Sequence, residues 1–347
     1  MINSLFLSTA LASLAALARA ADDPTVWTAD SRLHRSLWGM AYTGDTVEEV
    51  IKDVQLMSQP CARSNQTNKD VSNPFPPIQR LYSGGFFLKL VSKRNLHVFA
   101  GIYIDGNETT YERQRDQAFD VLDKYGVDNI LGITVGNEYL LQTSSGGGSV
   151  TTAETYLISK INEVRTMLQA KNYAKTIPVG SADAGSQITP ELAAAADYIM
   201  ANTHPFFSGI NIEGAADWTA QYLIDEEPRY ATAAGKTLYS AEIGWPTDAM
   251  AGGSLTLNGS AASIPDAQVL LDTFVCAANT NITAGGAYAN GYFWFELFDQ
   301  KWKEQYGGAE PFWGLFDQQR NLKNLNIPTC LAAAEAPVGT MGNNDGS

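Results

Sequence analysis

The sequence is poor in basic residues and in histidine. Its 347 residues include 23 Lys and Arg against 37 Asp and Glu, and the formal net charge is −14. Nucleic acids and anionic membrane surfaces are bound through clustered Lys and Arg, so the charge argues against both and suits a neutral substrate. The three histidines, His34, His97 and His204, are scattered and stand near no cysteine at metal-ligand spacing. We therefore predict no metal site and no cofactor.

Long apolar runs are also lacking. The first 20 residues, "MINSLFLSTALASLAALARA", form a short apolar run that ends in an A-x-A cleavage pattern, which predicts a signal peptide over 1–20. A membrane anchor is disfavoured because Ser and Thr interrupt the run. No other stretch is long enough to span a bilayer, and the tail lacks the hydrophobic end that a glycolipid anchor signal requires. We therefore predict a secreted protein, extracellular or in a cell wall.

Cysteine is scarce as well. Three cysteines, Cys61, Cys276 and Cys330, are an odd number for an oxidising compartment, so at least one stays outside any intramolecular disulfide. Four N-x-S/T sequons fit a glycoprotein that passes through the secretory route. The asparagines of these sequons are Asn65, Asn107, Asn258 and Asn281.

The sequence does contain a regular alternation of strand-like and helix-like runs, with 45% hydrophobic residues. The strand candidates are Leu37–Tyr42, Gln79–Tyr82, His97–Ile104, Ile130–Asn137, Thr176–Ala182, Tyr198–His204, Thr237–Ile243 and Gly291–Leu297. The helix candidates are Val47–Met57, Tyr111–Lys124, Ala153–Ala170, Pro190–Ala195, Ala215–Ala234 and Asp266–Ala278. Eight strands that alternate with helices predict an α/β protein, a (β/α)8 TIM barrel in a single domain.

The predicted barrel covers residues 37–331, between an N-terminal linker at 21–36 and a flexible tail at 332–347. A doubly wound open sheet is the alternative fold. It would carry a Gly-rich phosphate turn after the first strand, and "MAYTGDTVEEV" is not one. The helix at 153–170 has apolar residues spaced by three and four, and Thr151-Thr152 is its expected N-cap.

Two of the predicted strands end in a glutamate. "ILGITVGNEYL" places Asn137 and Glu138 at the end of the fourth strand, and "LYSAEIGWPTD" places Glu242 at the end of the seventh. The C-terminal ends of barrel strands converge on one face, so we expect the two carboxylates to meet there. Such a pair is typical of glycoside hydrolysis, in which one carboxyl group is the protonated acid and the other is ionised.

The residues around the two acids suit a sugar site. Asn137 can hydrogen-bond a sugar hydroxyl, and Trp245 offers a flat apolar face for a sugar ring. Gly244 lets the chain turn without a Cβ clash, and Pro246 fixes the backbone after it. Further aromatic residues lie at predicted strand ends: Tyr42, Tyr82, Tyr103, Tyr139, Phe206, Phe207, Phe295, Phe298 and Trp302.

These motifs resemble those of glycoside hydrolase family 17, in particular its fungal cell-wall β-1,3-glucanases and glucanosyltransferases. The resemblance continues in "ANTHPFFSG", "VGSADAG", "DTFVCAAN", "YGGAEPFWGLFD" and "NIPTC", and it covers most of 37–330. It implies a (β/α)8 barrel and a retaining reaction on β-1,3-glucan. Glu138 would be the general acid/base, and Glu242 the nucleophile that forms a covalent glycosyl-enzyme.

The resemblance also implies a disulfide and further site residues. Cys276 and Cys330 match the fungal disulfide of the family, which leaves Cys61 unpaired, and Glu296 and Asp299 match acidic positions around its cleft. The predicted substrate-binding residues are Tyr42, Tyr82, Asn137, Phe206, Trp245, Glu296, Phe298 and Asp299. We expect a monomer whose partner is β-1,3-glucan.

Two segments depart from the family pattern. An Asp-Cys pair is expected after "RLY", but the chain reads "RLYSGGFFLKLV", directly after an unusually long connection at 58–79. Residues 58–86 are either a genuine local variation or a gene-model error such as a retained intron. In addition, Gln300 replaces the last acid of the family's "FDE". Neither change touches Glu138 or Glu242.

Several functions stay open at this point. Hydrolysis and transglycosylation share the first half-reaction and differ in whether water or a sugar hydroxyl attacks the intermediate. A related barrel glycosidase could use the same two acids on cellulose or mannan, although the Trp-Pro after Glu242 argues against it. The non-enzymatic alternative is a glucan-binding wall protein with impaired catalysis.

Overall fold

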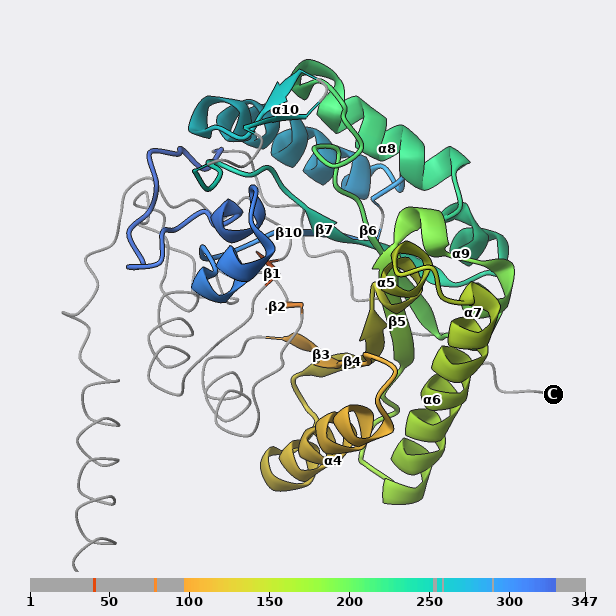
Figure 1. Cartoon of the computed structure of the whole chain (residues 1–347). Helices are drawn as coiled ribbons and strands as arrows, with labels where there is room; N and C mark the ends of the chain where they lie inside the picture. The colour runs from red at the N-terminus through yellow and green to blue at the C-terminus, as the bar shows by residue number, and fades with distance from the viewer. Residues whose placement is uncertain are drawn as a thin grey trace, which may run out of the picture.

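Eight parallel strands close into a barrel at the centre of the molecule (Figure 1). The structure is a computed structural model that describes residues 40–41, 78–79, 97–251, 255–257, 259–288 and 290–328. The strand order around the barrel is β1-β10-β7-β6-β5-β4-β3-β2. The strands are β1 Met40–Ala41, β2 Ile78–Gln79, β3 Val98–Ile102, β4 Ile130–Asn137, β5 Val179–Ala184, β6 Tyr198–Asn202, β7 Thr237–Ile243 and β10 Tyr292–Trp294. The predicted (β/α)8 barrel is confirmed.

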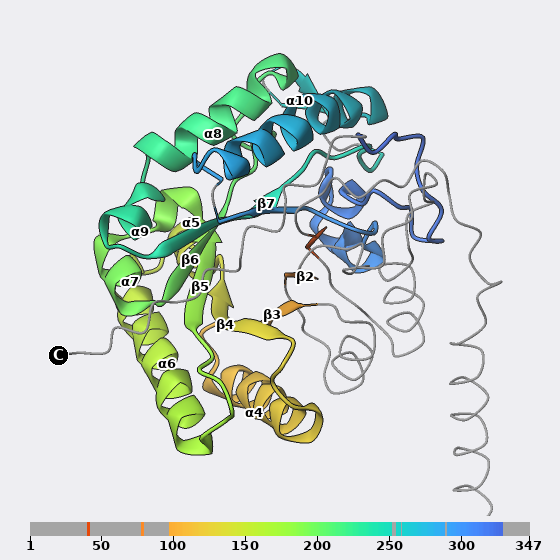
Figure 2. The same ribbon diagram turned by 180° about the vertical axis from the view of Figure 1, so that it is seen from behind.

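Helices cover the outer face of the sheet, as Figures 1 and 2 show from opposite sides. The α-helices are α4 Glu108–Tyr125, α5 Tyr139–Ser145, α6 Val150–Lys171, α7 Pro190–Ala195, α8 Ala215–Asp225, α9 Arg229–Ala233 and α10 Ile264–Thr283. The short 3₁₀ helices are η1 Gly185–Gln187, η2 Ile212–Gly214, η3 Lys301–Tyr306 and η4 Glu310–Phe312, and β8 Thr256–Leu257 pairs with β9 Ser260–Ala261. Within the described residues, no helix combines the length and the apolar character needed to cross a bilayer.

Strand β4, which ends just before Glu138, and strand β7, which contains Glu242, have the bounds that the sequence predicts. Both β4 and β7 are almost completely buried, because side chains of the barrel interior cover one face and helices cover the other. Such strands are apolar on both faces and are recognisable as continuous runs. The interior is filled by a cluster of buried side chains: Phe99, Ala182, Tyr198, Met200, Ala241 and Phe293.

The helix predictions need three corrections. The expected helix at 215–234 is two helices, α8 and α9, because the chain becomes extended at Glu226 and Pro228 starts a new helix. The N-cap of α6 is Ser149, whose hydroxyl accepts from the Thr152 backbone N–H, and not Thr151-Thr152. The seven-residue helix α5 was not expected, because its sequence, "YLLQTSS", is too short to show a helical period.

The ladders shift register where the strands reach the site. The β4–β5 pairing shifts between Thr134 and Asn137, and the β6–β7 pairing shifts between Ala201 and Asn202. The β7–β10 pairing also shifts between its two recorded pairs. Such bulges turn side chains away from the regular alternation and are frequent beside active sites.

Gly244, just after β7, lets the backbone at the C-terminal end of β7 lie close to the backbone that follows β10. A Cβ atom at this position would lie 1.8 Å from the Phe295 carbonyl oxygen. A glycine is therefore needed because the backbone at Phe295 leaves no room for a side chain. This refines the prediction that the glycine is there to let the chain turn after Glu242.

Some predictions fall outside the described residues and stay predictions. They are the signal peptide and linker, the tail, the helix Val47–Met57, the 58–79 connection, Tyr42, Tyr82, Cys61, Cys330, Asn65 and Asn258. Because Cys330 is among them, the pairing of Cys276 with Cys330 also stays a prediction.

The substitution Gly244→Ala is expected to destabilise the protein. The added methyl group forces the β7 and β10 ends apart, and overpacking of this kind costs about 1–3 kcal/mol. Thermal unfolding followed by circular dichroism measures the effect. The control is Gly214→Ala, where the added Cβ meets nothing within 4 Å; equal melting temperatures for the two variants would contradict the prediction.

Candidate active site

Glu138 forms the whole connection between β4 and α5. Its backbone adopts φ 52° and ψ 29°, a left-handed conformation that non-glycine residues rarely adopt. Its N–H donates to the Ala182 carbonyl at 3.1 Å, and its carbonyl accepts from the Gln142 N–H at 2.8 Å. Backbone strain of this kind clusters at functional sites. The junction projects the half-buried Glu138 side chain from the C-terminal end of β4.

Glu242 lies across the barrel mouth from Glu138. Its side chain is almost completely buried near the end of β7, and its backbone carbonyl accepts from the Thr203 N–H at 2.8 Å. A carboxylate oxygen of Glu242, one of Glu138 and a ring nitrogen of His204 all lie within 4.8 Å of one another. The expectation that the ends of the fourth and seventh barrel strands bring the two acids together is therefore confirmed.

The end of β6 contacts both carboxyl groups. Asn202 donates from Nδ2 to Glu138 Oε1 at 2.9 Å and to Asn137 Oδ1 at 3.1 Å. Two residues later, His204 Nε2 lies 3.1 Å from Glu242 Oε2. Asn137, predicted to bind a sugar hydroxyl, is buried with its amide oxygen engaged by Asn202. One chain segment thus supplies a partner to each acid.

The three clustered groups Glu138, His204 and Glu242 are close enough to hold a metal ion, but their chemistry does not suit one. A ligating histidine gives its lone pair to the metal and donates its other ring N–H to an acceptor. The other ring nitrogen of His204, Nδ1, is buried without a hydrogen-bond partner among the described residues. A proton moved to Nδ1 would therefore have no acceptor, so the set fits a carboxylate pair better than a metal centre.

Asp183, on β5, holds the start of the helix that follows Glu138. Its carboxylate accepts from the backbone N–H groups of Leu140, Leu141 and Ala184 at 2.9, 3.2 and 2.9 Å. Burial, together with the nearby Glu138 charge, raises the pKa of Asp183 to about 7, against the lowering effect of these N–H groups. Asp183 therefore holds the first turn of α5, and with it the β4–α5 junction, through these hydrogen bonds.

Two buried ion pairs lie beyond the end of β10. Lys303 Nζ donates to Glu296 Oε1 at 2.7 Å, and Lys323 Nζ donates to Asp299 Oδ1 at 2.6 Å. Burial raises the pKa of both acids, the lysine partners oppose this, and the Glu242 charge adds to the shift at Glu296. Glu296 and Asp299 were predicted to bind substrate; the structure shows each one engaged by a lysine.

The predicted stacking residues need correction. Trp245 is 1% exposed, and its Nε1 donates to the Ala261 carbonyl at 2.7 Å. Its ring packs edge-on against Phe206, which is also buried, as is Phe298. None of these three rings has a face open to a sugar. The large aromatic side chains that are exposed after β6 and β10 are Phe207, Trp302 and Tyr306.

Asn202, His204 and Asp183 are the site residues that sequence reasoning missed. They lie in "ANTHPFFSG" and "VGSADAG", at the ends of β6 and β5. Their positions at strand ends could have indicated a role in the site, but the histidines were considered only as possible metal ligands. Which polar strand-end residue contacts an acid depends on the register shifts, and these are not visible in the sequence.

A closed parallel barrel with two carboxyl groups close together at the ends of its fourth and seventh strands is an arrangement that suits glycoside hydrolysis. Comparison with known proteins specifies the family. The BtgE/BtgC glycoside hydrolase domain matches residues 45–314, and the chain belongs to this family. The resemblance to fungal glucan-active enzymes is thereby confirmed.

Individual relatives agree with this assignment. The Aspergillus terreus protein named "Probable glucan endo-1,3-beta-glucosidase btgC" is 37% identical over 247 residues, which cover 68% of this chain and 36% of that protein. The chain thus spans about a third of the length of the curated relatives it matches. The crystal structure of the family 17 β-1,3-glucanosyltransferase from Rhizomucor miehei has a TM-score of 0.64 at 20% identity, over 86% of this chain and 99% of that one. This likeness supports the fold.

The substitution Asp183→Asn is expected to change how stability depends on pH. The pKa of Asp183 in the folded protein, about 7, lies above its ordinary value of 3.8. Its contribution to stability is therefore complete below about pH 4 and is lost as the pH rises through about 7. Lowering the pH from 8 to 5 should raise the melting temperature of the wild type by a few degrees more than that of Asp183→Asn.

The matched control is Asp120→Asn, at an exposed position on α4. Parallel pH profiles for the wild type and Asp183→Asn would contradict the assignment, whereas Asp120→Asn should follow the wild type.

Proposed function

We propose that the protein is a retaining glycosidase or transglycosylase that acts on β-1,3-glucan. The observation that carries the proposal is the approach of the Glu138 and Glu242 carboxylate oxygens to within 4.8 Å. Retaining glycosidases need their two carboxyl groups about 5–5.5 Å apart, whereas inverting enzymes need about 6.5–9.5 Å to admit a water molecule. The names of the relatives support β-1,3-glucan as the substrate.

In the first step Glu242 is the nucleophile and Glu138 is the acid. A Glu242 oxygen attacks the anomeric carbon, the bond from that carbon to the leaving oxygen breaks, and the Glu138 proton passes to the leaving oxygen. Two like charges this close are unfavourable in a buried site, so the free pair favours holding one proton between them. The retaining mechanism requires that proton on Glu138, the acid, and the charge on Glu242, the nucleophile.

In the second step Glu138 acts as the base. It removes a proton from the incoming hydroxyl, whose oxygen attacks the anomeric carbon and releases Glu242. Water as the acceptor gives hydrolysis, and a sugar hydroxyl gives transfer. Phe207, 50% exposed beside His204, is one aromatic surface that an incoming sugar could contact.

The variants Glu138→Gln and Glu242→Gln are expected to lose turnover by about 1000-fold or more, because each removes a group that acts directly on the reacting bond. The measurement is timed product analysis on laminari-oligosaccharides of defined length, with NMR detection of the first anomer formed. Retention of the β-anomer is expected. Products longer than the substrate would indicate transfer, and only shorter ones would indicate hydrolysis.

The control is Glu191→Gln, at an exposed position in the first turn of α7, which should keep wild-type activity. An inverted product, or wild-type protein that binds laminarin without changing it, would contradict the proposal. Activity on cellulose or mannan but none on laminarin would support the related-glycosidase alternative.

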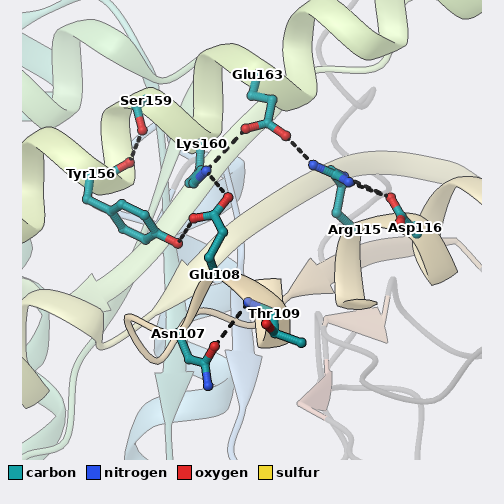
Figure 3. Close-up of polar contacts among 9 residues, drawn as sticks. All are labelled: Asn107, Glu108, Thr109, Arg115, Asp116, Tyr156, Ser159, Lys160 and Glu163. Atoms are coloured by element: carbon teal, nitrogen blue, oxygen red, sulfur yellow. Dashed lines mark hydrogen bonds and ion pairs between the residues drawn. The ribbon is translucent and has the colours of Figure 1, made fainter. Parts of the chain in front are cut away.

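We also propose that the protein is secreted as a glycoprotein and carries a glycan on Asn107. Asn107 is exposed at the N-cap of α4, where its Oδ1 accepts from the Thr109 N–H at 3.0 Å. In Figure 3 its amide nitrogen points away from these contacts. The next residue, Glu108, is held by Lys160 and Tyr156 of α6 at 2.6 and 2.9 Å, which fixes this end of α4.

Asn281 differs from Asn107 in its surroundings. It lies in the last turn of α10, half-buried, with its Oδ1 accepting from the Tyr288 N–H at 2.9 Å. Its side chain packs so tightly against the following turn that a Cβ on Gly286 would lie 2.4 Å from Asn281 Nδ2. The nitrogen that would carry a glycan therefore lies close against the turn at Gly286.

After secretion from a eukaryotic host, Asn107 is expected to be glycosylated and Asn281 unmodified. Enzymatic release of N-glycans in heavy-oxygen water, followed by peptide mass spectrometry, identifies each occupied asparagine. Asn107→Asp removes the glycan and keeps the capping acceptor, so it should fold normally. Occupancy of Asn281 without Asn107 would contradict the assignment, and absence of both secretion and glycans would contradict the secretory proposal.

A further inference from the structure

His204 lies against the carboxylate of the proposed nucleophile. The distance from His204 Nε2 to Glu242 Oε2 is 3.1 Å, and the two side chains are 11% and 5% exposed. This contact is well shielded from water. A hydrogen bond to a charged group in such surroundings is stronger than an exposed one.

The surroundings of the His204 ring determine which nitrogen carries the proton. Phe207, Phe295 and Trp313 surround the imidazole with ring centroids at 5.8, 5.2 and 5.0 Å. In the described part of the chain, Nδ1 is buried and meets no hydrogen-bonding group. A proton on Nδ1 would be a buried, unsatisfied donor, which costs free energy. The neutral ring with its proton on Nε2 avoids this cost and can donate to Glu242.

We infer that His204 is a positioning residue: its aromatic surroundings hold it as the neutral Nε2–H tautomer, which donates permanently to Oε2 of Glu242. This inference rests on the proposed function, because it assigns a partner to the proposed nucleophile. The hydrogen bond orients the carboxylate so that its other oxygen faces the anomeric carbon.

The same donor serves both half-reactions. Once one Glu242 oxygen is bonded to the anomeric carbon, Oε2 is the carbonyl oxygen of the resulting ester. Donation from Nε2 then stabilises the charge that returns to the carboxylate as the ester bond breaks. His204 keeps its own proton in both steps, and the proton transfers belong to Glu138.

Replacing His204 by residues with and without an N–H donor tests the inference. His204→Phe suits the aromatic surroundings but has no donor, whereas His204→Gln carries an amide N–H. We expect His204→Phe to lower kcat on laminari-oligosaccharides about 10- to 100-fold, as the loss of one hydrogen bond to a charged group would. KM should change less than about threefold, since the hydrogen bond acts on the protein and not on the sugar. His204→Gln should recover a large part of the loss.

A substrate with a good leaving group separates His204 from Glu138. An aryl β-laminaribioside whose phenol leaves without a proton should restore the first step of Glu138→Gln. The same substrate should not restore the rate of His204→Phe, because that variant lacks the hydrogen bond that orients the Glu242 carboxylate. The control His97→Phe replaces an exposed histidine that precedes β3, at the opposite end of the barrel, and should match the wild type.

The wild type offers a test that needs no variant. Long-range 15N–1H NMR of the histidine rings should show His204 protonated on Nε2 alone; a ring protonated on Nδ1, or on both nitrogens, would overturn the inference. It would equally fail if His204→Phe kept kcat within about threefold of an active wild type, or if His204→Gln were no better than His204→Phe. A wild type without activity on β-1,3-glucan would instead contradict the proposed function.

Discussion

Repulsion between two closely spaced carboxyl groups, the half-buried Glu138 and the buried Glu242, is the constraint around which the site is built. Unit charges within 4.8 Å of each other repel by about 3–4 kcal/mol at an effective dielectric constant of about 20. A hydrogen bond from a protein donor to a charged group contributes about 1.5–3 kcal/mol. Asn202 and His204 supply one such bond to each acid. The end of β6 therefore stabilises charge on either carboxyl group and helps to hold the two groups close together.

Other acidic residues near the barrel mouth also have partners that limit the repulsion between negative charges. Glu296 and Asp299 would add negative charge near Glu242, and each is paired with a buried lysine. Aromatic rings behind His204 exclude water, which strengthens the remaining polar contacts. In a chain with a net charge of −14, these local pairings keep negative charge from accumulating at the site.

The barrel and its two acids were predictable from the sequence because they depend on local patterns. Buried parallel strands are continuous apolar runs, and a glutamate at the end of such a run, as in β4 and β7, stands out. Residues whose roles depend on three-dimensional neighbours were harder to predict. Trp245 follows Glu242 closely in sequence, yet it packs inward against Phe206. Asp183 acts on α5, a helix too short to show a period.

The junction at Glu138 limits how this side of the mouth can change in length. β4 ends at Asn137 and α5 begins at Tyr139, so the acid itself is the entire linker. An insertion or deletion there would displace the acid or rotate α5 away from Asp183. Variation in length can enter only after α5, at the glycines 146–148 that precede α6. Any redesign of this side of the mouth, whether natural or engineered, would therefore begin at those glycines and leave Glu138 in place.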